Sequence, residues 1–463
     1  MKIRNRKPIS SAQVVTWRGR KPLNRLLWRK PQAALLLSLV MAGSVWFYVQ
    51  RILIPYQIAD AAAHGRPRGF LSDLYPRWLG ARELLLHHCD PYTPDVTREI
   101  QIGYYGRPLD PTRPNDPKDE QRFAYPVYVV FLLAPVAQMP FAPVRIAFAV
   151  LLAILTAVSV ILWLYFLGWR LSSVASATII VFTMGSFATI QGIKLQQLSL
   201  LVAGIIASAA ALLAGGHLFA AGFLLAVATI KPQLVLPLIV WLLLWSISQW
   251  HERRTLFWSF IIGMLFLVAA GEYVLPGWIG RFLTAVVAYR RYTENRSPLE
   301  VLTTVRVGML LTITLLAAIM AVCWRCRNSP VHSYAFHFVT ALMLIATLLI
   351  APTHAPYNQV LLLPAVLLIL RSWKHLWSKP WLRALCIIMA VVFGWPWLSS
   401  FCLMLGSIFL PPSNVQKAWP VPLWTSIALP LVVLGLLAPL ISEAWGSGTD
   451  LASVAEGPTS SQR

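Results

Sequence analysis

Acidic residues are scarce in this chain and are concentrated in one stretch. Of its 463 residues only 17 are Asp or Glu, against 39 Lys and Arg. Ten of the 17 acids lie between Tyr56 and Arg122, directly after the first hydrophobic run. Within the later apolar runs, Glu272 is almost the only acid. Ion-coupled carriers place ionisable groups near the middle of the bilayer, so this scarcity argues against a carrier. An enzyme that needs a carboxylate base has to find it between residues 56 and 122.

Cysteines and common cofactor motifs are also few. The chain has five cysteines, an odd number, and only Cys89 lies in a long polar stretch, so no disulfide framework is indicated. It has neither a Walker A run nor a GxSxG motif. Cys323 and Cys326 are too close to His332 and His337 for zinc-finger spacing. The sequence therefore indicates no cofactor, and it leaves a divalent metal requirement open.

Hydrophobic sequence is abundant. It makes up 57% of the chain, the mean hydropathy is +0.65, and only 12% of residues are charged. Many apolar runs approach the ~20 residues that cross hydrocarbon as a helix. They are continuous rather than alternating, which favours helices over a barrel. We predict an all-α, polytopic transmembrane bundle of about twelve spans, at residues 33–54, 144–168, 171–190, 195–214, 217–231, 233–249, 255–276, 299–323, 334–352, 356–371, 384–405 and 420–441.

The basic residues predict the topology of these spans. Residues 1–31 hold ten Lys and Arg and no acid, and short basic clusters follow later apolar runs. This is the positive-inside pattern. It explains the net charge of +22, because the excess Lys and Arg would lie on the cytoplasmic side next to anionic lipids. No basic stripe carries interleaved aromatic residues, so no nucleic acid partner is expected.

The predicted organisation follows from that orientation. Residues 1–32 form a basic cytoplasmic arm that leads into a retained signal anchor. Residues 33–441 form the transmembrane domain, in which 55–122 are a large extracytoplasmic loop. Three prolines interrupt residues 123–140, which we interpret as a re-entrant or interfacial segment. The tail at 442–463 is expected to be disordered and cytoplasmic. We predict a multi-pass protein of the plasma (inner) membrane with both termini in the cytoplasm.

Asp73 is the first candidate for a catalytic carboxylate. Apolar residues recur at helical spacing from Leu71 to Leu86, which predicts an interfacial helix that begins at Ser72 or Asp73. Asp73 is then either a helix N-cap or a base, and the two roles are compatible. Asp60 and Asp116 are the alternative bases. Asp116 lies in a Pro-rich loop that is either simply solvated or ordered by substrate.

Lys231 is a cation within apolar sequence, where an unpaired charge costs roughly 2.5–3.5 kcal/mol on insertion scales. A phosphate is a natural partner for it, and snorkelling to the interface is the alternative. In the predicted topology this lysine shares the outer side of the membrane with the acidic loop. So do several other polar residues at span ends, namely Gln191, Lys194, Gln196, Gln197, Gln233, Arg290, Arg291, His354 and Asn358. We therefore expect one extracytoplasmic cleft that combines carboxylates and cations.

The order of these features resembles glycosyltransferase family 87, a group of GT-C-type membrane enzymes that includes polyprenol-phosphate-mannose-dependent mannosyltransferases. The resembling elements are Asp73 followed by Pro91-Tyr92, then Phe123-Ala-Tyr125-Pro126, the amide-rich turn at 191–197, and Lys231-Pro232-Gln233. They cover roughly residues 55–250. The chain departs from the family where the turn reads Gln-Gly-Ile rather than Asn-Gly-Gln, and it has a long insertion at 103–121.

The resemblance implies a GT-C-like fold and an inverting hexosyltransferase. Such an enzyme moves a sugar, with mannose as the family-level guess, from a polyprenyl-phosphate donor to a lipid or glycan acceptor at the extracytoplasmic face. Asp73 would act as the general base. We expect Lys194, Lys231, Arg290 or Arg291, and His354 to contact the donor phosphate, and the substrate-positioning residues to be Tyr75, Arg82, Tyr92, Tyr125, Gln191, Gln196, Gln197 and Gln233.

Two other functions stay open at this point. A multi-pass transporter or lipid flippase of an envelope glycan pathway would share the spans, and so would a noncatalytic assembly partner in that pathway.

Overall fold

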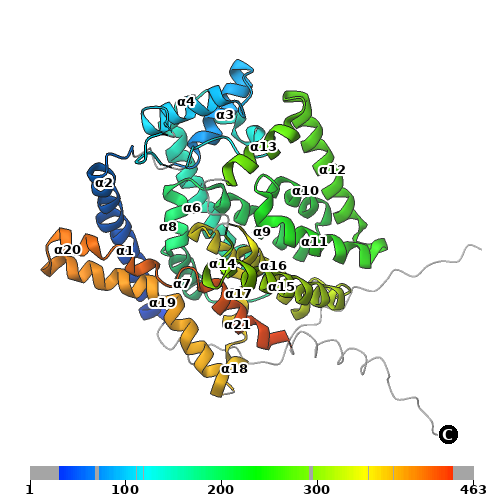
Figure 1. Cartoon of the computed structure of the whole chain (residues 1–463). Coiled ribbons are helices and arrows are strands. Elements are labelled where there is room, and N and C mark those ends of the chain that lie inside the picture. Colours follow the sequence, from blue (N-terminus) through cyan, green and yellow to red (C-terminus); the bar gives the residue numbers. More distant parts are fainter. Residues whose placement is uncertain are drawn as a thin grey trace, which may run out of the picture.

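The structure is a computed structural model that describes residues 31–67, 72–110, 112–117, 119–290, 296–352, 354–378 and 380–441. Every regular element in those ranges is helical, as predicted (Figure 1). The N-terminal elements are α1 (Pro31–Tyr48), the π-helical turn η1 (Val49–Leu53), α2 (Ile54–Ala63), α3 (Tyr75–His87), α4 (Pro94–Tyr105), α5 (Val129–Leu133) and the 3-10 turn η2 (Ala134–Val136).

The central elements are α6 (Phe141–Phe166), α7 (Ser173–Met184), α8 (Phe187–Lys194), α9 (Leu198–Ala214), α10 (Leu218–Ala228), α11 (Pro232–Ser248), α12 (Trp250–Val274) and α13 (Trp278–Arg290). The C-terminal elements are α14 (Pro298–Leu302), α15 (Val305–Cys326), α16 (Tyr334–Ile350), η3 (Pro356–Leu362), α17 (Leu363–Arg371), α18 (Trp373–Leu376), α19 (Pro380–Phe409), α20 (Pro412–Lys417), η4 (Val421–Leu423), α21 (Leu429–Leu437) and η5 (Ala438–Leu440).

Each of the twelve predicted spans contains helical residues, but the helices differ in length from the predicted spans. Within the described ranges, five helices are long and apolar enough to cross a membrane: Pro31–Ala63, α6, α12, α15 and α19. A sixth candidate is the bent pair α7 and α8, whose axes differ by 59°. The remaining apolar helices have at most 17 residues each. Residues 123–140 contain only the short α5 and η2. The predicted total of twelve crossings therefore stays a prediction.

The bend between α7 and α8 has a local cause. Helix α7 ends at Met184, and Ser186 caps α8, because its hydroxyl accepts a hydrogen bond from the backbone N–H of Thr189 at 3.2 Å. Gly185 lies directly against α1, where a Cβ would meet the backbone of Ala42. The chain thus turns where α1 crosses it, and α8 leads into a tight turn before α9.

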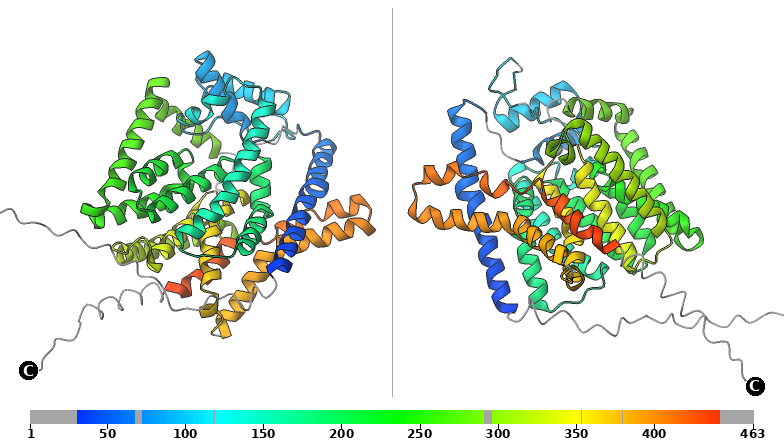
Figure 2. Two further views of the ribbon diagram at one scale, coloured as in Figure 1. Left: turned by 180° about the vertical axis from the view of Figure 1, so that it is seen from behind. Right: turned by 60° about the horizontal axis from the view of Figure 1, so that its bottom comes forward.

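A helix does lie where the sequence predicts an interfacial one, but its start and its surroundings differ from the prediction. It begins at Tyr75 instead of Ser72 or Asp73, and its N-cap is Leu74, which makes no side-chain capping bond. Most of α3 is buried, because it packs against α4, α5 and Phe141. The α3–α4 layer covers one end of the bundle (Figures 1 and 2).

The first and last thirds of the chain meet beside this bundle. Helices α1 and α19 pack side by side, and the Tyr48 hydroxyl donates to the backbone oxygen of Trp419 at 2.5 Å (Figure 2). Tyr48 belongs to a smaller apolar cluster with Ile52, Phe187 and Trp397. Helix α1 is therefore fixed to the C-terminal helices.

Helices α10 and α12 approach closely at Gly222. A Cβ placed there would lie 2.5 Å from the carbonyl oxygen of Leu256 and 3.0 Å from the backbone nitrogen of Phe260. Backbone atoms of a packed helix cannot move aside as a flexible side chain does, and small residues at such crossings are typical of membrane helices.

We predict that Gly222→Ala destabilises the protein by about 1–3 kcal/mol, the usual cost of overpacking. Gly394→Ala on α19 is the matched control, because nothing lies within 4 Å of its added Cβ. Thermal unfolding in detergent, followed by size-exclusion chromatography, measures both. Equal melting temperatures for the two variants would contradict the close α10–α12 approach.

Candidate functional site

Asp73 lies at the centre of the candidate site. Its backbone N–H donates to the carbonyl oxygen of Leu195 at 2.8 Å, in the turn between α8 and α9. Its carboxylate oxygen Oδ2 accepts a hydrogen bond from the side-chain amide of Gln197 in the same turn. The N-cap interpretation of Asp73 was therefore wrong: the carboxylate bonds to a distant part of the chain rather than to α3.

Lys231 reaches the same turn from the junction of α10 and α11. Its Nζ donates to Oε1 of Gln197 at 3.1 Å and to Oγ of Ser199 at 2.5 Å. The Ser199 hydroxyl donates in turn to Oδ1 of Asn358 in η3 at 2.7 Å. A continuous hydrogen-bonded chain thus joins Asp73 to Lys231 and Asn358 across four separate segments.

Arg77, one helical turn into α3, lies beside Asp73. Its guanidinium donates to the backbone oxygen of Asp73 at 2.7 Å and stacks over the ring of Tyr125, 4.5 Å from the ring centre. The Nε of Arg77 is buried without a hydrogen-bond partner among the described residues. Tyr92 supports this arrangement, because its hydroxyl donates to the backbone oxygen of Tyr125 at 2.6 Å.

Asp119 is a second carboxylate in the surroundings of Asp73. Its two oxygens accept hydrogen bonds from the backbone N–H and side-chain amide of Gln121, at 3.0 and 2.8 Å. Its backbone oxygen accepts from the Tyr105 hydroxyl at 2.9 Å. Burial raises the pKa of Asp119, and the positive charge of Arg77 opposes that rise.

The surroundings of Asp73 favour a basic carboxylate. Desolvation raises its pKa, and the negative charge of Asp119 acts in the same direction. Arg77, Lys231 and the bond from Gln197 lower the pKa, but the net direction is upward. A carboxylate with a raised pKa is suited to general base catalysis.

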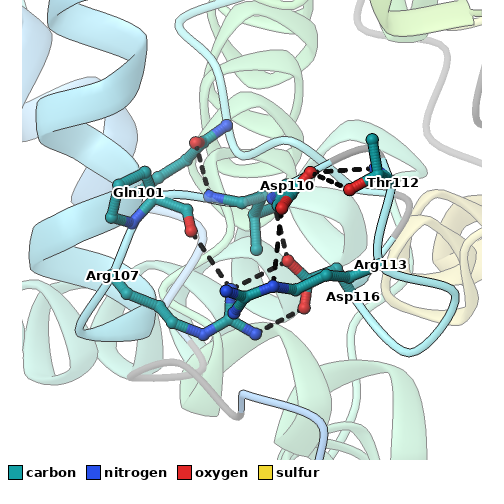
Figure 3. Close-up of polar contacts among 8 residues, drawn as sticks. Gln101, Arg107, Asp110, Thr112, Arg113 and Asp116 are labelled. Carbon is teal, nitrogen blue, oxygen red and sulfur yellow. Dashed lines mark hydrogen bonds and ion pairs between the residues drawn. The ribbon is translucent and has the colours of Figure 1, made fainter.

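The two alternative bases are less suited to that role. Asp116 pairs with Arg107 and also accepts the backbone N–H of Asp110 at 2.9 Å (Figure 3). The hydrogen bond from Arg107 lowers the pKa of Asp116 to about 2. The described residues of the Pro-rich loop thus bond to one another, and Gln101 Oε1 accepts a hydrogen bond from the Leu109 N–H. Asp60 on α2 pairs with His64 and Arg66, at 3.3 and 3.6 Å.

Several other predicted residues lie at the edge of the site or serve the fold. Gln196, at a φ of +47°, donates to the backbone oxygens of Ile193 and Lys194 and so closes the turn. Gln191 is on α8, and its Oε1 is buried without a hydrogen-bond partner among the described residues. Lys194 ends α8 and is partly buried.

The remaining predicted residues have other surroundings. Gln233 is exposed. Arg82 stacks on Trp78 at 5.6 Å, and Tyr75 packs against Phe141 with ring centres 4.9 Å apart.

His354, Arg290 and Arg291 were also predicted to contact the donor phosphate. His354 lies 3.3 Å from the Ser426 hydroxyl, and burial lowers its pKa, which favours the neutral imidazole. Arg290 ends α13, and Arg291 lies outside the described residues.

Sequence reasoning missed three residues of the site: Arg77, Asp119 and Ser199. Arg77 and Asp119 look like ordinary members of a polar stretch. Asn358 was expected among the polar residues on the outer side, because it is an amide at the start of an apolar run, but it was given no role.

Comparison with known proteins identifies the family. Residues 123–352 match the family model described as glycosyltransferase family 87. The chain belongs to glycosyltransferase family 87. No curated protein and no solved structure matches the chain. Membership of family 87 confirms the resemblance predicted from the sequence and indicates a membrane glycosyltransferase rather than a carrier.

The family match differs in extent from the expected resemblance. It begins at Phe123 and continues to Pro352, whereas the resemblance was expected over 55–250 and weakly beyond. Gln197, Lys231 and the α9–α11 region lie within the match, and Asp73 precedes it. The assignment of Asp73 therefore rests on the contacts that connect it to the matched region.

The raised pKa of Asp73 predicts a cost in stability. Because the folded-state pKa exceeds the unfolded one, ionisation of Asp73 opposes folding, and the penalty grows as pH rises through the folded pKa. We predict that Asp73→Asn has a higher melting temperature than the unmodified protein at pH 7. The difference is expected to shrink as the pH falls, because protonated Asp73 carries no charge, just as Asn carries none. A lower melting temperature for Asp73→Asn at pH 7 would contradict this electrostatic description.

Proposed function

We propose that this protein transfers a sugar from a polyprenyl-phosphate donor to a lipid or glycan acceptor, with the active site at the extracytoplasmic face of the plasma membrane. The observation that supports it best is the position of Asp73, whose carboxylate has a raised pKa and accepts a hydrogen bond from Gln197 of the family 87 region. Mannose is the first sugar to test, because family members use it.

In the proposed reaction Asp73 removes the proton from the acceptor hydroxyl. The oxygen attacks the anomeric carbon, and the bond between that carbon and the donor phosphate oxygen breaks, so the phosphate leaves with the electron pair. Attack from the face opposite the phosphate inverts the configuration. Positioning and base catalysis together provide several powers of ten in rate. Asp73 is returned to its carboxylate form when it releases the proton to water.

The leaving phosphate gains negative charge as the bond breaks, and a nearby cation stabilises it. Arg77 is suited to this role, because its guanidinium adjoins Asp73 and its stacking on Tyr125 fixes the plane of the fork. Lys194, at the end of α8, is a further candidate. The polyprenyl chain would remain in hydrocarbon, which suits a donor presented from the bilayer.

The primary test compares lipids and envelope glycans from cells that have or lack the gene, by mass spectrometry, and then restores the gene with single variants. We expect one glycolipid or glycan to disappear without the gene. Asp73→Asn should fail to restore it, with transfer in isolated membranes reduced on the order of 10²–10⁴-fold, the usual contribution of a general base. Asp60→Asn and Asp116→Asn are matched controls that should restore it. Restoration by Asp73→Asn would exclude Asp73 as the base.

Arg77→Lys tests the donor phosphate. Lysine keeps the charge but loses the planar fork and the stacking on Tyr125, so we expect a higher KM for the polyprenyl-phosphate donor, on the order of 10-fold for one lost charge-assisted contact. The measurement is donor saturation in membranes with a panel of polyprenyl-phosphate hexoses. Arg82→Lys is the matched control, since Arg82 stacks on Trp78 instead. An unchanged donor KM in Arg77→Lys would remove Arg77 from the phosphate site.

A further inference from the structure

The ammonium group of Lys231 is already surrounded by partners. Lys231 is only 6% exposed. A lysine has three N–H donors, and here they face Oε1 of Gln197 at 3.1 Å, Oγ of Ser199 at 2.5 Å and the ring of Tyr357, 5.2 Å from its centre. A donor phosphate could bind this ammonium only by displacing one of those contacts. Lys231 is therefore poorly placed as a direct phosphate ligand.

The chemistry of each partner fixes the direction of every hydrogen bond. An ammonium only donates, so Gln197 has to present its carbonyl oxygen to Lys231. The amide nitrogen of Gln197 then points the other way, and there it donates to Oδ2 of Asp73. An ionised carboxylate only accepts, so the amide matches both ends in one orientation. The reversed amide would place an N–H against the ammonium and an oxygen against the carboxylate.

The other end of the chain is fixed in the same way. The Ser199 hydroxyl accepts from Lys231, and its own proton goes to Oδ1 of Asn358. Asn358 is 7% exposed and Ser199 is 1% exposed, so neither can readily replace these bonds with water. The ammonium is thus held on two sides, and this fixes its position relative to Gln197.

We propose that Lys231 is a positioning residue that acts on Asp73 through the amide of Gln197, and that it does not bind the donor phosphate. The inference rests on the proposed function, in which Asp73 is the base. The bond from Gln197 occupies Oδ2 of Asp73, so the proton of the acceptor is expected at Oδ1. Lys231 therefore selects the amide orientation that aims the carboxylate.

The electrostatic surroundings give a readout for this role. The charged groups that act on Asp73 are Arg77, Asp119 and Lys231, and its charge in turn acts on Tyr104, Tyr105, Tyr289 and Tyr357. Lys231 and the bond from Gln197 both lower the pKa of Asp73. Removal of either should raise that pKa further, so the acidic limb of the pH–rate profile should move to higher pH.

A double-mutant cycle tests the proposal. The four forms are the unmodified protein, Lys231→Met, Gln197→Leu and the double variant, assayed in membranes with the polyprenyl-phosphate hexose that the unmodified protein uses. We expect Lys231→Met alone to lower kcat on the order of 10²-fold, the cost of a misplaced catalytic group, with little change in donor KM. In the Gln197→Leu background the same change should cost less than about 3-fold, because residues that act in one network are not additive.

Two further arms separate positioning from general damage. Lys374→Met is the matched control, since it makes the same chemical change at an exposed lysine of α18 and should leave kcat unchanged. If Lys231→Met lowers the yield of folded protein, Ser199→Ala takes its place in the cycle, because it removes one support of the ammonium and keeps the charge. Ser199→Ala should lower kcat by less than Lys231→Met does. In the Gln197→Leu background it should leave kcat unchanged. The acidic limb should shift upward in both Lys231→Met and Gln197→Leu.

The outcomes distinguish this inference from the proposed function. Additive losses together with a raised donor KM in Lys231→Met would overturn the inference and return Lys231 to the phosphate, while Asp73 could remain the base. Full transfer by Asp73→Asn would overturn the proposed mechanism itself. An unshifted acidic limb in Gln197→Leu would also overturn the inference, since the amide would then have no influence on the carboxylate.

Discussion

The site depends on how the protein keeps a carboxylate charged, oriented and basic in poorly solvated surroundings. A direct ion pair with Lys231 would keep the carboxylate charged and oriented, but it would lower the pKa of the carboxylate and so make it less basic. At an effective dielectric constant near 20, opposite charges 4 Å apart attract by about 4 kcal/mol, and the attraction halves when the distance doubles. The amide of Gln197 between the two groups keeps the lysine one hydrogen bond further away. Asp73 is thus oriented while its pKa stays raised.

The bundle brings the members of this chain together from distant parts of the sequence. The break after α7 turns α8 toward Asp73 and places Gln197 at the start of α9. The junction of α10 and α11 is held by Tyr128, whose hydroxyl bonds to the backbone oxygen and hydroxyl of Thr229 at 3.0 and 2.9 Å. Thr229 lies two residues before Lys231, so a tyrosine outside the site fixes where the ammonium emerges.

The site residues that could be predicted from the sequence are polar residues within hydrophobic runs, where an unpartnered polar group costs free energy. Lys231 and Gln197 interrupt hydrophobic runs, and a polar group there requires a partner, so the sequence predicts that each is used. Their partners were not predictable, because the same argument allows a phosphate, an acid or an amide. Asp119 and Arg77 lie in a loop where polar residues are ordinary. Their place beside Asp73 follows from how the loop folds.

The sequence alone could not show which acid is suited to act as the base, because the pKa of each carboxylate depends on its tertiary contacts. The sequence ranks Asp73 before Asp116, but both are acids of one polar stretch and it shows the partners of neither. The difference arises because Arg107 reaches Asp116 from only nine residues away, whereas Gln197 reaches Asp73 from 124 residues away. A local arginine neutralises the first carboxylate and depresses its pKa. Asp73 keeps a raised pKa because its burial outweighs the charges of Arg77 and Lys231, and because the group that donates to its carboxylate is an amide.

Helix length explains why the site forms at these junctions. A run of apolar residues predicts a helix but does not say whether it crosses hydrocarbon alone or is buried by longer neighbours. Helix α10 has 11 residues, which is about 17 Å of rise against roughly 30 Å of hydrocarbon. If one end of α10 lies at a bilayer surface, its other end lies within the hydrocarbon depth. Irregular backbone at that depth is tolerated only where protein covers it or a cavity adjoins it. The bends at 195–197 and 229–231 therefore require covering partners, and the α3 layer and η3 provide them through Asp73 and Asn358.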